Sequence, residues 1–161
     1  MNIFGKTLVA TIGTAVLLGA LAARAQNGAE APPAAASPQD EPYRPSLSDI
    51  MAQQQERHIK LWFAGHAVNW PLADYEIGEL SDGFDDVGTM LGGGLVKKHV
   101  GAPLDALQKA VDGKNSAAFA TAFDQLSAGC NTCHQALDHA FIAIARPTAL
   151  PHSDQVFAPQ K

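Results

Sequence analysis

Apolar residues between positions 46 and 146 recur at intervals of three and four, which is the period of an α-helix. No stretch in this region shows the sustained two-residue alternation of a half-buried strand, so the pattern predicts an all-α chain. A first helix should begin at Ser46, because Asp49 stands three residues later, where it can complete a capping box. Its inward face carries Leu47, Ile50 or Met51, Gln54, His58, Leu61 and Gly65.

Three further helices follow in the same pattern. One should begin at Asn69, with Pro71 in its first turn, and end at the glycines of positions 92–94. A shorter helix is expected from near Pro103 to about Gly113. Because the links are short, the predicted fold is an antiparallel four-helix bundle. The last helix is expected over residues 116–144, with an inward stripe of Phe119, Phe123, Leu126, Cys130, Cys133, Leu137, Phe141 and Ile144.

The two ends of the chain lack this pattern. Residues 1–25 contain a basic residue, an apolar run and the small-x-small sequence Ala23-Arg24-Ala25, which together predict a cleaved signal peptide. The run, about 16 residues, is shorter than the ~20 that a spanning helix needs, so we expect a periplasmic protein that does not insert into the membrane after cleavage. Residues 26–45 are rich in Ala and Pro and predict a disordered linker. Residues 46–146 are expected to form the helical domain, and residues 147–161 an irregular tail.

The charge balance bears on partners. Cleavage would remove Lys6 and Arg24, which leaves nine basic residues against 16 acidic ones and a formal charge of −7. This excess of negative charge argues against nucleic acid and against anionic membranes as partners. The acidic residues of the second helix are interpreted as its solvated face: Asp74, Glu76, Glu79, Asp82, Asp85 and Asp86.

Residues 129–135, GCNTCHQ, hold the only two cysteines of the chain, Cys130 and Cys133, and His134 follows directly. The motif fits a thiol redox pair, half of a zinc site or a covalent haem attachment. A thioredoxin-like pair would need neighbouring strands and a structural zinc would need four ligands, and the sequence predicts neither. Haem attachment needs two thioethers and one axial nitrogen on the same helix face, which this spacing provides. Export agrees, because an unused CxxC pair would tend to oxidise to a disulfide outside the cytoplasm.

With these residues the chain resembles the class II c-type cytochromes, the cytochrome c-prime group, which are four-helix bundles with the haem motif near the end of the last helix. Here CNTCH occupies that place, and the resemblance covers residues 46–146. It implies one haem c bound covalently to Cys130 and Cys133, with His134 as the proximal iron ligand. The family often carries a basic residue near the haem propionates, one turn past that histidine, where this chain has Asp138. The remaining candidates for the propionate partner are Arg57, Lys60 and Arg146.

The second axial side of the iron separates the functions that the resemblance implies. If the last helix continues about ten residues past His134, the matching level on an antiparallel first helix lies near residue 56. His58 is therefore the expected distal ligand, an open position is the second expectation, and Met51 is the third. The other histidines are interpreted as surface or structural groups: His66, His99, His139 and His152.

The leading hypothesis is a periplasmic monohaem electron carrier that exchanges electrons with periplasmic redox proteins and is not an enzyme, since no catalytic residues are required. The alternative is the binding of nitric oxide or another diatomic gas at a five-coordinate haem. Its open side would be closed by Leu47, Ile50 or Leu61. A third hypothesis is a non-haem redox or metal-binding bundle that uses the CxxCH residues alone. Class II cytochromes are often antiparallel dimers, so the resemblance also implies a homodimer.

Overall fold

A computed structural model describes residues 42–92 and 94–161. The predicted signal peptide, and all but the last few residues of the predicted linker, lie outside the described residues. Within these ranges there are four helices and no strand: α1 (Leu47–His66), α2 (Trp70–Leu91), α3 (Leu95–Asp112) and α4 (Ser116–Ala136). The all-α prediction is therefore confirmed for this part of the chain. None of its helices combines the length and the apolarity that a membrane span needs.

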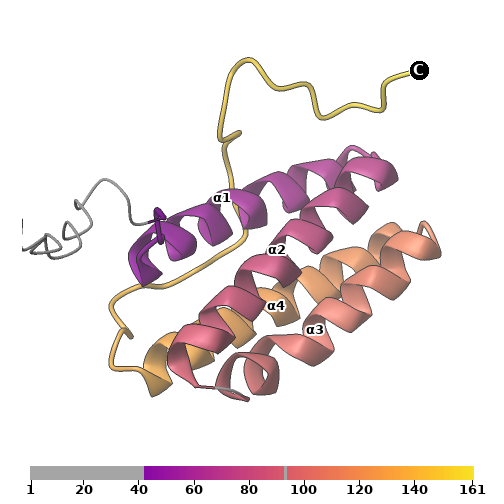
Figure 1. The fold of residues 1–161 in the computed structure, drawn as a ribbon. Helices are drawn as coiled ribbons and strands as arrows, with labels where there is room; N and C mark the ends of the chain where they lie inside the picture. Colours follow the sequence, from indigo (N-terminus) through magenta and orange to yellow (C-terminus); the bar gives the residue numbers. More distant parts are fainter. Residues whose placement is uncertain (1–41, 93) are drawn as a thin grey trace, which may run out of the picture. The chain divides into compact units, whose positions relative to one another are not determined.

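Successive helices run in opposite directions and pack side by side (Figure 1). α1 packs on α2, α2 on α3 and α3 on α4, whereas the contact between α1 and α4 is thinner. The buried core draws on all four helices, with Leu61, Leu80, Leu107 and Phe123 at or near zero exposure. This arrangement is the one expected of a four-helix bundle.

Side-chain caps fix the starts of three helices. The Ser46 hydroxyl accepts a hydrogen bond from the Asp49 amide at 3.2 Å, and the Asp49 carboxylate accepts one from the Ser46 amide at 2.9 Å. The predicted capping box is thus confirmed. Asn69 caps α2 and Asn115 caps α4 in the same way, each through its side-chain oxygen.

The prediction that the third helix starts near Pro103 is wrong, because α3 begins at Leu95 and Pro103 lies inside it. Proline has no N–H for the carbonyl four residues earlier, which here belongs to His99. That carbonyl faces Gly129 of α4, where a Cβ atom would overlap it. The glycine lets the two backbones approach, and the buried Val96 and Val100 extend the apolar face before the proline. Tertiary packing offsets the cost of an internal proline.

The fourth helix also differs from its prediction: it ends at Ala136 instead of residue 144. Asp138 has a φ of 61°, a left-handed conformation that ends the helix, and the His139 amide donates to the His134 carbonyl at 2.7 Å. The chain then folds back, and Asn131 and Ile144 exchange two hydrogen bonds of 2.8 and 2.7 Å. We call residues 137–144 the return segment. Phe141, predicted to face inward, is 81% exposed.

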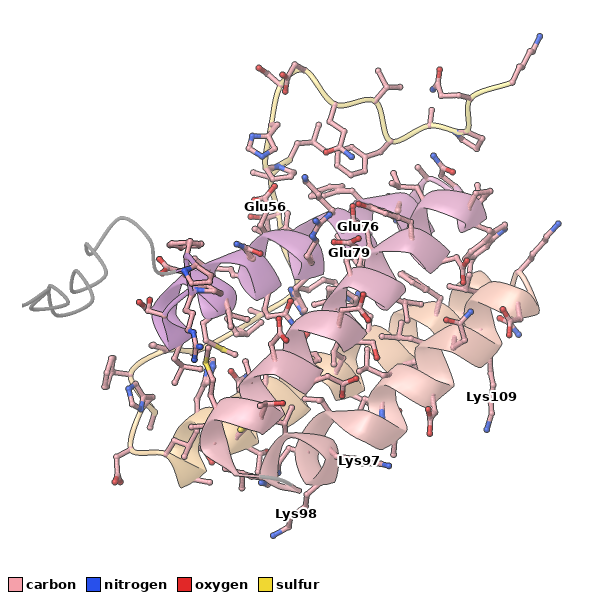
Figure 2. All side chains as sticks on the ribbon, viewed as in Figure 1. Glu56, Glu76, Glu79, Lys97, Lys98 and Lys109 are labelled. Atoms are coloured by element: carbon pink, nitrogen blue, oxygen red, sulfur yellow. The ribbon has the colours of Figure 1, made fainter. Side chains whose placement is uncertain are left out.

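The interpretation of the acidic α2 face is wrong at Glu76, which is buried with 1% exposure. Arg57 of α1 lies 3.3 Å from the Glu76 carboxylate and 2.7 Å from that of Glu79. Figure 2 labels the two glutamates on α2. Burial raises the pKa of Glu76, and the positive charge of Arg57 opposes this shift. A carboxylate can occupy this position because the guanidinium reaches it from the neighbouring helix.

The C-terminal residues have no helix or strand but pack along the bundle. Arg146 pairs with Asp124 at 2.7 Å and lies over the ring of Trp62, 4.4 Å from its centroid. Further on, the buried Phe157 packs against Phe63. The tail therefore adds side-chain contacts to α1, whose own contact with α4 is thin.

Candidate functional site

A cavity of about 540 Å³ lies between the four helices and the return segment, and it brings the predicted site residues together. Cys130, Cys133 and His134 line it from α4, and Met51 and His58 line it from α1. All five residues were chosen from the sequence as haem-linking or iron-binding groups. Their presence around one cavity means that there is space beside the CxxCH motif for a bound group.

The lining of this cavity is mostly apolar and carries no Asp, Glu, Lys or Arg. Its volume and composition are typical of sites for small molecules or cofactors. The polar lining residues besides His58 and His134 are Ser48, Gln54, Gln55 and His139. The apolar lining residues are Leu47, Ala52, Leu80, Phe84, Val87, Leu91, Val96, Val100, Leu126, Leu137, Ile142 and Ile144.

The two thiols are free and protonated at neutral pH. Burial raises the pKa of Cys130 to about 11, with a smaller contribution from the charge of Cys133, and burial also raises the pKa of Cys133. A thiol-exchange site needs a thiolate that is stabilised by a positive charge or a helix N-terminus. Here the motif lies in the last two turns of α4, so its surroundings differ from those of a redox-active thiol pair.

The imidazole of His134 is oriented by the return segment. Its Nδ1 lies 2.9 Å from the carbonyl oxygen of Ile142. A carbonyl only accepts hydrogen bonds, so Nδ1 carries the proton and donates, which leaves the lone pair of the neutral ring on Nε2. This is the usual arrangement of a metal-binding histidine, whose second nitrogen donates to a backbone carbonyl or a carboxylate.

His58 is held differently. It is 4% exposed, and its Nε2 lies 2.8 Å from the hydroxyl oxygen of Ser127. That hydroxyl also lies 3.0 Å from the carbonyl oxygen of Phe123. Ser127 has only one hydroxyl hydrogen, so both contacts are satisfied when Ser127 donates to Phe123 and His58 Nε2–H donates to Ser127. Burial lowers the pKa of His58 to about 4, which keeps its ring neutral.

The His58–Ser127 contact also fixes the register of α1 against α4. His134 lies seven residues beyond Ser127 on α4, and seven residues before His58 on the antiparallel α1 is Met51. Each interval spans ~10 Å at ~1.5 Å per residue, so Met51 lies level with His134. The expectation for His58 assumed a long continuation of the last helix, whereas α4 ends two residues after His134.

Sequence reasoning missed His139 as a lining residue. It was interpreted as a surface or structural group because it falls off the motif face of a continuing helix. The return segment instead turns it toward the cavity, and its Nδ1 lies 2.6 Å from the Leu137 carbonyl oxygen. No local signal in the sequence marks this turn, because Leu137, Phe141 and Ile144 keep the helical spacing through it. His66, His99 and His152 do not line the cavity.

The three basic candidates for a propionate partner are not among the lining residues, and each faces a carboxylate. Arg57 pairs with Glu76 and Glu79, and Lys60 lies 3.5 Å from Glu56. Arg146 pairs with Asp124. The cavity therefore has no positively charged side chain in its lining.

Among residues 42–92 and 94–161, no three His, Cys, Asp or Glu side chains converge as the ligands of one ion would. Compared with protein-family models, curated proteins and solved structures, the chain matches none. The indications of function therefore come from the chain's own residues and from the geometry of this cavity.

Proposed function

We propose that the protein is a periplasmic monohaem c-type cytochrome that carries electrons. The observation that carries this proposal is the clustering of Cys130, Cys133 and an oriented His134 around one uncharged cavity of about 540 Å³. The two thiols would hold the haem through thioether bonds, and the Nε2 of His134 would bind its iron. When bound, haem c supplies reversible one-electron chemistry at its iron.

The chain's own residues suit this task. The hydrogen bond from His134 to the Ile142 carbonyl fixes the ring and leaves Nε2 available. The apolar lining excludes water and lowers the local polarity, which influences the reduction potential of a buried centre. No set of catalytic groups is needed for electron transfer, and the expected partners are redox proteins of the same compartment.

For the distal ligand we propose Met51 ahead of His58. Met51 lines the cavity at the level of His134, whereas the Nε2 of His58 is engaged with Ser127. A thioether ligand raises the reduction potential of haem iron compared with a second imidazole. The export proposal rests on the sequence of residues 1–25, and N-terminal sequencing of the mature protein should begin close to Gln26.

Acid-acetone extraction of the purified protein tests the attachment. Two thioether bonds should keep the colour with the protein. Replacing both Cys130 and Cys133 by Ala should abolish this retention. Haem that extracts freely from the wild type, or stays attached in the double variant, would contradict the proposal.

Absorption spectra of the oxidised holoprotein test the distal side. A sulfur-to-iron charge-transfer band should appear in the wild type, vanish in Met51→Ala and persist in His58→Ala. Met90→Ala is a matched control, because Met90 is half exposed and lies outside the cavity lining. If the wild-type iron is low-spin without that band, and the low-spin state is lost in His58→Ala, then His58 is the ligand. A high-spin wild type that binds carbon monoxide would instead favour the gas-binding function.

A further inference from the structure

The mouth of the cavity lies between α1 and the return segment. Of the residues that line the cavity, those classed as exposed are Ser48, Ala52 and Gln55 on α1 and His139 and Ile142 on the return segment. The deeper lining is apolar or already hydrogen-bonded. Any charged part of a bound cofactor must therefore be placed at this mouth, because burying an ion without a partner costs several kcal/mol.

A haem carries two carboxylates on one edge, and the lining offers them no cation. The carboxylates must then be met by neutral N–H or O–H donors of the chain or by water. A polar lining residue can receive the acidic edge only if it keeps a hydrogen that it does not already donate.

The donors deeper in the cavity are buried or half-buried, and most of them already make hydrogen bonds. One of the two N–H groups of the Gln54 amide donates to the Leu80 carbonyl at 2.7 Å, and His58 Nε2–H donates to Ser127. The Nδ1–H of His134 donates to the Ile142 carbonyl. None of these hydrogens is available to a ligand without breaking an internal hydrogen bond, which would leave a buried polar group unsatisfied.

Two of the donors at the mouth, on Ser48 and His139, already make hydrogen bonds as well. The Ser46 hydroxyl donates to the Asp49 carboxylate at 2.7 Å, so the hydroxyl of Ser48, 2.8 Å from Ser46 Oγ, must be the donor of that second contact. His139 donates its Nδ1–H to the Leu137 carbonyl, and a neutral ring has no second N–H to donate.

Gln55 is the polar residue at the mouth whose donors remain. Within residues 42–92 and 94–161 its carboxamide makes no hydrogen bond, and the residue is exposed. We propose that Gln55 donates a hydrogen bond to the acidic edge of the cofactor, so that a neutral amide takes the place of the basic residue. This inference rests on the proposed haem and assigns the group that receives its carboxylates.

The absence of a cationic side chain from the lining should affect the reduction potential of the iron. Negative charge near the iron stabilises its oxidised form, and the lining supplies no positive charge to offset it. A cation introduced at position 55 should therefore raise the reduction potential, and an anion should lower it. The neighbouring Gln53 offers a matched control, because it is also exposed on α1 but does not line the cavity.

The experiment compares Gln55→Arg, Gln55→Glu and Gln55→Ala with the same three changes at Gln53, all as holoproteins. Spectroelectrochemistry should give a higher midpoint potential for Gln55→Arg and a lower one for Gln55→Glu, with much smaller shifts at Gln53. Resonance Raman spectra should show a displaced propionate bending band in Gln55→Ala and an unchanged band in Gln53→Ala. Glutamine and its replacements are sound helix formers on an exposed face, so folding should be preserved.

Equal potentials and equal Raman bands in the two series would overturn the role of Gln55. A change in both series of the same size would overturn it too, because it would reflect general surface charge. If the wild type carries no covalent haem, the proposed function itself fails, and that result is separate from the comparison of positions 55 and 53.

Discussion

The histidines that line the cavity differ in which ring nitrogen is engaged. His134 and His139 use Nδ1 toward backbone carbonyls, whereas His58 uses Nε2 toward Ser127. A neutral imidazole has one N–H, so the lone pair lies on Nε2 in the first two and on Nδ1 in His58. Nε2 is the nitrogen farther from the backbone and extends into the cavity more readily. This difference supports His134 as an iron ligand and gives His58 a structural part.

His58 should make the stability of the protein depend on pH. Burial lowers its pKa from 6.5 to about 4, so between these values the unfolded chain binds a proton that the folded chain does not. The free energy of unfolding should therefore fall as the pH drops from 6.5 toward 4, by about 3 kcal/mol from this group. Gln at position 58 keeps an N–H for Ser127 and does not titrate.

Urea unfolding at pH 7 and near pH 4 measures this effect in the wild type and in His58→Gln. The other titrating groups, including Glu76, are common to both proteins and cancel in the comparison. The wild type should lose more stability on acidification than the variant. Identical losses would show that His58 is not held neutral by burial.

At the scale of single helices, the boundaries set by local signals are predicted and those set by distant contacts are not. Ser46 and Asn69 are local signals, because a cap needs only its own side chain and an amide three residues later. The start predicted near Pro103 was wrong because a proline inside α3 is tolerated through the close packing at Gly129, which is 26 positions away in the chain. The end of α4 depends on the pairing of Asn131 with Ile144, another contact that spacing does not reveal.

In the candidate site, too, some features follow from local sequence and others depend on distant contacts. The spacing of Cys130, Cys133 and His134 places them on one helix face, so their convergence on one cavity could be expected from sequence. The position of the opposite ligand along α1 could not be predicted from the sequence, because it depends on where α4 ends and on the register of α1. The donors that remain at the mouth also depend on the return segment, whose fold is set by hydrogen bonds to α4.

Gly129 and Gly78 should respond in opposite ways to replacement by Ala. A Cβ at Gly129 would overlap the His99 carbonyl and push α3 from α4, whereas a Cβ at Gly78 meets nothing within 4 Å. Gly129→Ala should lower the free energy of unfolding by about 1–3 kcal/mol, as overpacking does. Gly78→Ala should raise it by ~0.4–1 kcal/mol by reducing the freedom of the unfolded chain.

Chemical denaturation of both variants gives the comparison directly. Because Gly129 precedes Cys130, its replacement should also reduce the yield of haem-loaded protein, whereas Gly78→Ala should leave that yield unchanged. A stable, fully loaded Gly129→Ala protein would show that α3 and α4 do not need to approach so closely.

Across the domain of residues 43–161, the thin contact between α1 and α4 is supplemented by the C-terminal residues. Arg146 bridges Asp124 of α4 and the Trp62 ring of α1, and Phe157 packs on Phe63. The cavity also lies between α1 and α4, with the return segment at its mouth. The segment after α4 therefore serves both the closing of the bundle and the shaping of the site.

Phe157 tests whether the tail is an integral part of the fold. Phe157 is 7% exposed, its ring centroid lies 5.8 Å from that of Phe63, and its carbonyl accepts a hydrogen bond from Asn69 at 3.1 Å. Phe157→Ala should lower the free energy of unfolding by about 1.5–3 kcal/mol, the value of burying a large apolar side chain. It should also speed cleavage of the tail by a protease of broad specificity, because the tail would detach more often. Val156→Ala is the matched control, since Val156 is 64% exposed.

If both variants unfold and are cleaved like the wild type, the tail contributes nothing to stability. A loss confined to Phe157→Ala would instead show that the α1 side of the bundle depends on residues far beyond the last helix.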